Sequence, residues 1–310
     1  MIAHYADHFV LPLPAGHRFP MAKYAALRDR LLAQFPDIRL REAPPATDGE
    51  LALAHTPSYI AAVAQGLLTA EQQKAIGFPW SPAMAERARR SVGGTIAALR
   101  TALADGLSAN LAGGTHHASA DGGSGFCVFN DVAVAARVVQ AEWGRRTRRA
   151  CQVAIIDLDV HQGDGTARIF RRDPTVFTLS LHAERNFPFE KPPGDLDVGL
   201  PDGCGDADYL AALDRALALL DEHFAADLVL YLAGADPHEG DRLGRLKLSD
   251  AGMQARDRRV FDWAGQRRLP LAFVMAGGYG RDMDTTLRVQ TATYGVALEA
   301  YRRWHAEGRP

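Results

Sequence analysis

Residues that could bind a metal follow the most apolar strand-like run of the chain. The run Ala154-Ile155-Ile156 breaks abruptly into Asp157-Leu158-Asp159-Val160-His161. Asp159 and His161 are two positions apart, so at the frayed end of a strand their side chains have the same parity and can point at one ion. Carboxylate and imidazole ligands suit a divalent transition metal. The sequence therefore predicts a metal site that includes Asp159 and His161.

Asp236 is the third expected ligand. It follows a second apolar run, Leu228–Ala233, as Asp159 follows its own strand. The alternative is an ordinary helix-capping or turn carboxylate, but the matching position after a strand favours a ligand. Three protein ligands leave coordination positions free for water and a substrate carbonyl oxygen, which is the arrangement of a catalytic site and not of a closed structural one.

Two further groups have the chemistry to move or donate protons. The adjacent pair His116-His117 follows two glycines, and one of these histidines could take a proton from water and return it to a leaving amine. Asp157 and Asp164 flank the expected ligands, and either could form a hydrogen bond that tunes the basicity of that histidine. Tyr279, between glycines, could donate a hydrogen bond to an oxyanion; a tyrosine packed on a surface turn is an equal alternative.

The elements that must position these groups alternate in type. Helical periodicity runs through 21–35, 82–105, 130–143, 207–224, 249–268 and 285–303, and apolar strand-like runs cover 153–158, 175–181, 228–233 and 271–275. This alternation predicts an α/β fold with a central, mainly parallel sheet and helices on both faces. Such sheets place their chemistry at the carboxyl ends of the strands, so Asp159, Asp236 and Tyr279 should meet at one edge.

The composition of the chain disfavours a protein that binds nucleic acid or anionic lipid through its overall charge. The 310 residues carry a formal charge of -2, with 47% apolar and 23% charged residues, so the chain has no overall attraction to nucleic acid or anionic lipid. We expect one domain over residues 1–310. The basic cluster Arg145–Arg149 is interpreted as a solvated loop, and Gly122–Gly125 lacks the Gly-Lys-Ser/Thr that a phosphate-binding loop requires.

Cysteine use and hydropathy predict a cytoplasmic protein. Cys127, Cys151 and Cys204 form no CxxC pair and are too few for a disulfide framework. The first nine residues do not have the form of a secretory signal, and no apolar stretch approaches the roughly 20 residues that span a bilayer. We expect no membrane partner, and the sequence leaves the oligomeric state open.

Together these motifs resemble those of the histone deacetylase family, zinc-dependent amidohydrolases that share an α/β fold with arginase. The matching motifs occur in the family's order, from about His17 to about Thr293: His116-His117, Gly125–Ala133, Asp157–Thr166, Gly234–Asp236 with Gly240-Asp241, and Gly277–Tyr279. Residues 11–21 and 180–189 are more similar to the class IV branch and its bacterial relatives than to class I enzymes.

The resemblance assigns a role to each catalytic candidate. It makes Asp159, His161 and Asp236 the metal ligands and Tyr279 the phenol that polarises the carbonyl. It pairs His116 with Asp157 and His117 with Asp164. His117 would then be the general base and acid, and His116 its electrostatic partner.

The resemblance also implies a substrate channel and a second ion. Gly125 and Phe126 would line the channel for the acyl-lysine stem, with either Phe187 or Phe189 as the other wall. A structural potassium ion would be held by main-chain oxygens of Asp157, Asp159, His161 and Leu181 and by side-chain oxygens of Asp157 and Ser180. The catalytic ion would be zinc, and ferrous iron is compatible with the same ligands.

The expected activity is removal of an acyl group, acetyl or longer, from acyl-lysine or a related acylated amine by metal-activated water. One alternative is an arginase-like ureohydrolase with two manganese ions, but the single Asp159-x-His161 pair followed by Gly163 offers few ligands for a second ion. The other alternative is a non-catalytic module that binds acyl-lysine. The presence of every expected catalytic residue disfavours it.

Overall fold

The computed structural model describes residues 1–7, 10–11, 13–14 and 16–308. Pro12 and Ala15, both within the stretch 11–21 that carries part of the family resemblance, lie outside the described residues. Among the described helices, none combines the length and the apolar character that crossing a bilayer requires.

One parallel sheet of eight strands forms the centre of the described structure, in the order β2-β1-β3-β8-β7-β4-β5-β6. The strands are β1 (Ile2–Tyr5), β2 (Arg39–Glu42), β3 (Leu107–Asn110), β4 (Val153–Asp157), β5 (Val176–Ala183), β6 (Leu196–Leu200), β7 (Leu228–Leu232) and β8 (Leu271–Val274). The predicted α/β architecture is confirmed.

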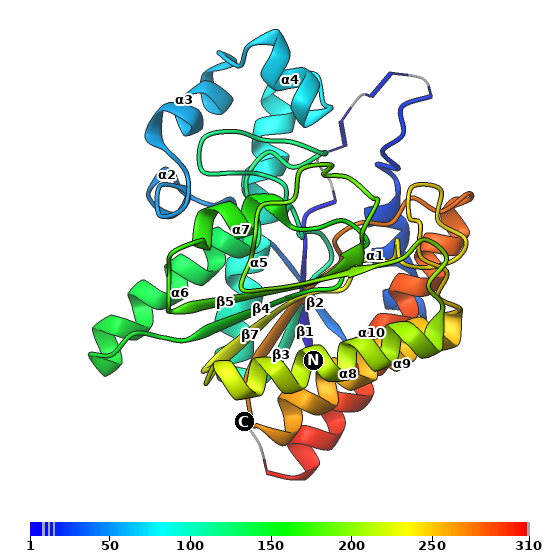
Figure 1. Cartoon of the computed structure of the whole chain (residues 1–310). Coiled ribbons are helices and arrows are strands. Elements are labelled where there is room, and N and C mark those ends of the chain that lie inside the picture. The colour runs from blue at the N-terminus through cyan, green and yellow to red at the C-terminus, as the bar shows by residue number, and fades with distance from the viewer. Residues whose placement is uncertain (8–9, 12, 15, 309–310) are drawn as a thin grey trace.

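Helices cover both faces of the sheet (Figure 1). One face carries α1 (Lys23–Gln34), α8 (Asp206–His223), α9 (Asp250–Gln266) and α10 (Met283–Ala306), and the other carries α5 (Pro82–Asp105), α6 (Asp131–Thr147) and α7 (Asp164–Phe170). The short helices α2 (Asp48–Leu51), α3 (Pro57–Gln65) and α4 (Ala70–Ile76) lie between β2 and α5 along the chain.

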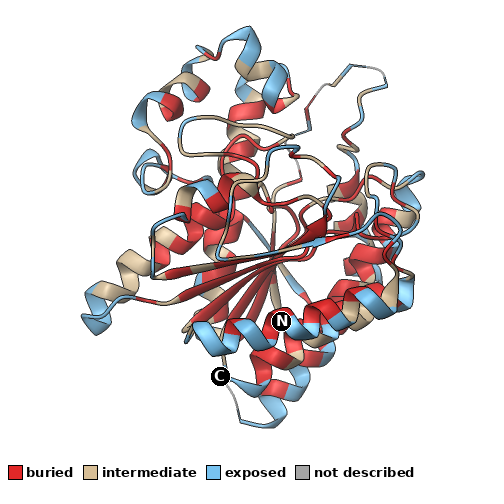
Figure 2. Cartoon of the chain, in the orientation of Figure 1, coloured by how far each residue is buried: buried red, intermediate tan, exposed pale blue. Residues whose placement is uncertain are grey.

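The alternation of side chains along each strand divides the core into two layers. Ala154 and Ile156 of β4 pack into the layer under α8, α9 and α10, whereas Val153 and Ile155 pack into the layer under α5 and α6. Because both faces are covered, the central strands are buried throughout, as the red sheet between pale-blue outer helix surfaces in Figure 2 shows.

Four strands were not predicted from the sequence, and their residues explain why. The strands β2 and β6 lie at the two edges of the sheet, and each has a neighbouring strand on one side only. Most of their side chains are partly or fully exposed, so neither strand has a continuous apolar run. β3 is buried but contains Ser108 and Asn110, whose side chains donate to the carbonyls of Ile2 and Ser91. β1 has only four residues, which is too short for a periodic signal.

The strand order gathers the expected site. β3, β8, β7 and β4 are consecutive neighbours in the middle of the sheet. The segments after their carboxyl ends carry, in the same order, His116 with His117, Tyr279, Asp236, and Asp159 with His161. Residues more than 160 positions apart in sequence therefore lie along one short stretch of sheet edge.

Candidate metal and catalytic site

Asp159, His161 and Asp236 form a cluster whose ligand atoms all lie within 4.8 Å of one another. β4 ends at Asp157, so Asp159 and His161 lie in the turn just beyond the strand, as expected. The Nδ1 atom of His161 is 2.9 Å from Oδ1 of Asp159 and 3.4 Å from Oδ2 of Asp236. Both carboxylates are fully buried, and a buried carboxylate is stable only when a positive partner or hydrogen bonds compensate its charge.

The residues around the cluster fit a bound cation. Oδ2 of the buried Asp236 accepts no hydrogen bond from any described residue. A Cβ atom on Gly277 would lie 1.9 Å from that oxygen and 2.6 Å from Oδ2 of Asp159, so only glycine leaves this space open. Carboxylate oxygens and imidazole nitrogens are ligand types that zinc and iron both accept.

Without a metal ion, the closely spaced charges of the cluster shift the pKa values of Asp236 and His161. Burial and the nearby Asp159 raise the pKa of Asp236 to about 7. Burial alone would lower the pKa of His161, but the hydrogen bond with Asp159 and the nearby negative charge of Asp236 overcome this effect and raise this pKa to about 10. The cluster therefore holds a proton where a divalent ion would supply the positive charge.

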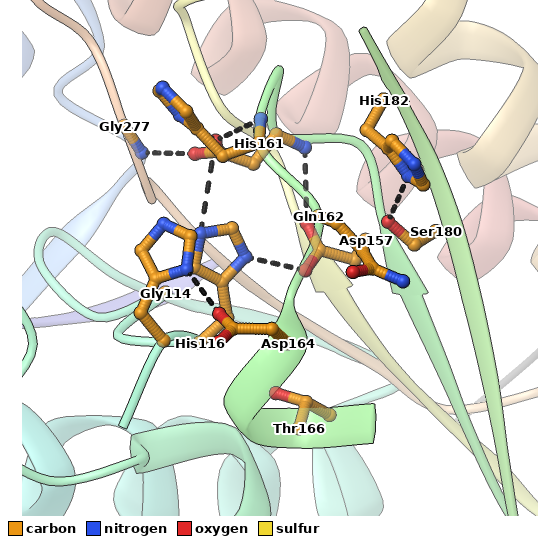
Figure 3. A network of polar contacts seen from close by, with 12 residues as sticks. Gly114, His116, Asp157, His161, Gln162, Asp164, Thr166, Ser180, His182 and Gly277 are labelled. Carbon is orange, nitrogen blue, oxygen red and sulfur yellow. Dashed lines mark hydrogen bonds and ion pairs between the residues drawn. The ribbon is translucent and has the colours of Figure 1, made fainter. Parts of the chain in front are cut away.

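Two histidine–carboxylate pairs lie beside the cluster. Nδ1 of His116 is 2.6 Å from Oδ2 of Asp157 (Figure 3). Nδ1 of His117 is 2.6 Å from Oδ1 of Asp164. Nε2 of His116 lies 3.8 Å from Oδ1 of Asp159. Each carboxylate fixes its imidazole by Nδ1, so the Nε2 atoms are left for the reacting groups.

The two neighbouring histidines differ in protonation. Burial would lower the pKa of His116, but the negative charges of Asp157 and Asp159 outweigh this effect and raise the pKa to about 9. Burial and the positive charge of His116 lower the pKa of His117 to about 4, against the opposing hydrogen bond with Asp164. At neutral pH His117 is therefore the uncharged member, which is the form that accepts a proton.

Asp131 holds the histidine loop, and the sequence interpretation did not assign it a role. Its Oδ2 atom accepts from the backbone N–H of Gly114 at 3.0 Å and from the Thr95 hydroxyl at 2.6 Å. Its Oδ1 atom accepts from the backbone N–H and the hydroxyl of Thr115, both at 2.7 Å. This buried carboxylate satisfies the donors of the turn before His116 and fixes its path.

Asp241 fixes Tyr279 in a similar way. One oxygen of the buried Asp241 accepts from the backbone N–H of Tyr279 at 2.6 Å, and the other accepts from the N–H groups of Leu243 and Gly244. Burial, followed by the charges of Asp159 and Asp236, raises the pKa of the Tyr279 hydroxyl well above its usual value. The phenol therefore stays protonated and can donate a hydrogen bond.

A cavity of about 810 Å³ opens over these groups; His116, His117, Asp159, His161 and Tyr279 are among its lining residues. It is large enough for an extended acylated side chain.

Aromatic rings form the cavity walls. The Phe126 ring lies 5.9 Å from the Tyr279 ring, and the Phe187 ring lies 4.9 Å from the His117 ring. A Cβ atom on Gly125 would lie 2.6 Å from the His117 ring and 3.3 Å from the Phe187 ring, so this glycine keeps the passage open. Phe189 is 86% exposed. Of the two candidates for the second wall, Phe187 is thus the one that packs beside His117.

The residues expected around a monovalent ion are adjacent as well. Asp157 of β4 and Ser180 of β5 are register partners, and Leu181 follows in β5. The Ser180 hydroxyl lies 2.9 Å from Nδ1 of His182 (Figure 3). Oδ1 of Asp157 accepts from the backbone N–H of Asp159 at 3.1 Å.

Comparison with known proteins identifies the family. A family model described as the histone deacetylase domain matches residues 17–294. An uncharacterized protein of Picosynechococcus is 42% identical over 301 residues, covering 96% of this chain and 98% of that protein. Histone deacetylase 2 of Arabidopsis thaliana is 36% identical over 204 residues, covering 65% of this chain and 51% of its own length. The chain thus spans about half of that plant relative.

Solved structures agree with the fold. The crystal structure of a histone deacetylase homologue complexed with SAHA superposes with a TM-score of 0.81 at 26% identity, covering 96% of this chain and 83% of the homologue. A homologue from Aquifex aeolicus gives a TM-score of 0.79 at 24% identity, covering 97% of this chain and 88% of the other. With the family model matching most of its residues, the chain belongs to the histone deacetylase family.

Proposed function

We propose that this protein is a metal-dependent deacylase that hydrolyses the amide of an acylated lysine or a related acylated amine. One observation carries the proposal: the cluster of Asp159, His161 and Asp236 lies beside two histidine–aspartate pairs and Tyr279 at a single aromatic-walled cavity. Family membership supports the reaction class. The SAHA complex of a homologue supports a ligand that enters such a channel.

Zinc is the metal we propose, with ferrous iron as a chemically equivalent occupant of the same ligands. Bound there, the ion would act as a Lewis acid on the substrate carbonyl and lower the pKa of a water molecule. Asp159, His161 and Asp236 would hold it. Main-chain oxygens of Asp157, Asp159, His161 and Leu181, with side-chain oxygens of Asp157 and Ser180, would hold potassium.

The remaining steps belong to the side chains. His117, uncharged at neutral pH and held by Asp164, takes the proton from the attacking water. His116, positively charged beside Asp157, stabilises the negative charge that develops. Tyr279 donates a hydrogen bond from its hydroxyl to the oxyanion. As the C–N bond breaks, protonated His117 returns its proton to the leaving amine. Phe126 and Phe187 hold the methylene stem and exclude water from it.

Turnover of a graded substrate panel tests the proposal. Purified protein is incubated with peptides that carry lysine acylated by chains from acetyl to long fatty acyl, with and without a chelator. We expect amine release that the chelator abolishes and that added zinc restores. An Asp236→Asn variant, which removes one ligand charge, should release no amine. Failure of the wild-type protein to release amine from any member would favour a non-catalytic acyl-lysine-binding module.

Metal counting separates the proposal from the arginase-like alternative. One equivalent of zinc or iron per chain is expected, because the cluster found among the described residues has one set of three ligands. Two equivalents of manganese with release of urea from a guanidino substrate would favour a ureohydrolase. We further propose that residues 1–310 act as one catalytic domain in the cytoplasm.

A further inference from the structure

Three arginines lie at the rim of the catalytic cavity. Arg18, Arg185 and Arg245 are exposed, and all three belong to the lining of the cavity. The only carboxylate among the described lining residues is Asp159, which is assigned to the metal. The whole chain has a formal charge of -2, so this local excess of positive charge does not follow from the overall composition.

The rim arginines stand on both walls of the channel. Arg18 precedes Phe19, whose ring lies 5.4 Å from Phe126 on one wall. Arg185 is two residues before Phe187, which forms the other wall. A side chain that enters between Phe126 and Phe187 therefore brings the groups around it close to positive charge on either side.

The loops that carry Arg185 and Arg245 are fixed to each other. The buried Asn186 accepts from the backbone N–H of Arg245 at 3.0 Å and donates to the carbonyl of Leu243 at 2.7 Å. Lys191 donates to the carbonyls of Asn186 and Pro188. The two arginines are thus held at the rim by a defined backbone, which reduces the entropy that a bound ligand must overcome.

Two of the arginines are available for a ligand. Within the described parts of the chain, neither Arg18 nor Arg185 forms an ion pair, whereas Arg245 lies 2.8 Å from Asp202. Glu184, beside Arg185 in sequence, lies against Gly199 of β6 and is not part of the cavity lining. Among the described residues, no carboxylate therefore pairs with Arg18 or Arg185 at ion-pair distance, and both guanidinium groups can bind a ligand.

We infer that the substrate of this protein carries carboxylate groups next to the acylated amine. The inference rests on the proposed function and narrows its substrate class. Guanidinium groups bind carboxylates through charge-assisted, bidentate hydrogen bonds. Acyl-lysine with acidic flanking residues fits this rim, whereas a basic peptide or an acylated polyamine meets charge of its own sign.

Peptides that differ only in flanking charge test the inference. Three acyl-lysine peptides carry Glu, Gln or Lys on both sides of the modified residue. The wild-type protein should give a kcat/KM about tenfold higher for the Glu peptide than for the Lys peptide at low salt, at about threefold per arginine. The ratio should approach one near 1 M salt, where the Debye length is about 3 Å. Free Nε-acyl-lysine, which has a carboxylate, is compared with its carboxamide, which does not. Faster turnover of the carboxylate form would favour a small acidic substrate over an acidic peptide.

The double variant Arg18→Gln with Arg185→Gln should lose most of this ratio. Arg172→Gln is the matched control, since Arg172 is exposed and lies before the amino end of β5, away from the cavity. It should keep the ratio. Equal kcat/KM values for the Glu and Lys peptides, or a preference for the Lys peptide, would overturn the inference.

Binding measurements separate this inference from the proposed function. The Tyr279→Phe variant should turn peptides over about 10²- to 10³-fold more slowly than the wild-type protein, so fluorescence anisotropy at short times gives their Kd. Tighter binding of the Glu peptide to the variant, together with no amine release by the wild-type protein, would refute the deacylase and keep the acidic ligand. Equal Kd values for the Glu and Lys peptides would refute the acidic ligand, whatever the turnover.

Discussion

His116 and His117 are chain neighbours with the same side chain, and their surroundings give them opposite charges. Asp157 and Asp159 raise the pKa of His116 to about 9, whereas burial and the charge of His116 lower that of His117 to about 4. The difference arises because His116 faces two carboxylates and His117 faces one carboxylate and a cation. This asymmetry supports the proposed roles of His117 as the base and His116 as its electrostatic partner.

Substitution of each histidine tests that division. His117→Asn should lower kcat by about 10²- to 10⁴-fold, since positioned general bases contribute about that much, whereas His116→Asn should lower it less. Rates are measured on an acetyl-lysine peptide, and zinc content is measured alongside to show that the ion is still bound. A His117→Asn variant that retains wild-type kcat would refute the assignment.

Tyr279→Phe removes one hydroxyl from the cavity wall. Loss of an oxyanion donor typically lowers kcat by about 10²- to 10³-fold. We expect a loss of that size with zinc affinity unchanged, because Asp159, His161 and Asp236 are the proposed ligands. Steady-state kinetics and zinc titration give the two values. Wild-type turnover in this variant would show that the phenol has no role in the reaction.

At the residue scale, the candidate metal ligands could be predicted from the sequence. The residues that position the segments of the site could not. Asp159, His161 and Asp236 could be proposed because ligand types follow apolar strands. Asp131 and Asp241 act by accepting hydrogen bonds from backbone N–H groups of other segments. Those partners become neighbours only when the chain is folded, so spacing alone could not reveal them.

At the scale of elements, the site depends on how two strand ends are joined. Arg256 of α9 is fully buried and donates to the carbonyl of Leu158, just before Asp159, and to that of Gly234, two residues before Asp236. Its charge is paired with Asp257 at 2.8 Å. This guanidinium therefore ties the segment after β4 to the segment after β7.

Arg256→Met should weaken zinc binding by about 10- to 100-fold, the usual effect of removing a group that orients metal ligands. It should also lower the free energy of unfolding by about 3–5 kcal/mol, because Asp257 would be left buried without its cation. Isothermal titration and denaturant unfolding give the two values, with the exposed Arg258→Met of the same helix as the control. Unchanged zinc affinity in folded Arg256→Met protein would remove its positioning role.

The six long helices α1, α5, α6, α8, α9 and α10 and the strands β4, β5, β7 and β8 could be predicted because their sequence patterns reflect burial on one or both faces. The order of the strands could not, because pairing between β3 and β8 joins segments more than 160 residues apart in sequence. That order is what places the histidine loop beside the tyrosine turn. β6 escaped prediction because an edge strand alternates between exposed and partly buried residues.

At the scale of the whole molecule, buried neutral histidines make stability depend on pH. Burial lowers the pKa of His55 from 6.5 to about 4, and its Nε2 atom accepts a hydrogen bond from the N–H of Asn130 at 2.9 Å. Between these two pKa values the unfolded chain binds the proton and the folded protein does not. Stability from His55 is therefore present above about pH 6.5 and is lost as the pH falls towards 4.

Comparison with His55→Gln isolates this contribution. The wild-type protein should be more stable than the variant at pH 7, and the difference in free energy of unfolding should shrink steadily as the pH is lowered to about 4.5. Denaturant unfolding across this range gives both curves. A difference that stays constant with pH would show that His55 is protonated equally in the folded and unfolded states.

The proposed activity of the molecule depends on one divalent ion that is bound by the segments after two strands, β4 and β7. Anomalous X-ray diffraction from crystals grown with zinc, recorded at the zinc absorption edge, tests the position of this ion most directly. We expect one anomalous peak within about 2.0–2.2 Å of the Nδ1 atom of His161 and of a carboxylate oxygen each from Asp159 and Asp236. A peak elsewhere, two peaks at this site, or no peak in zinc-saturated crystals would contradict the account.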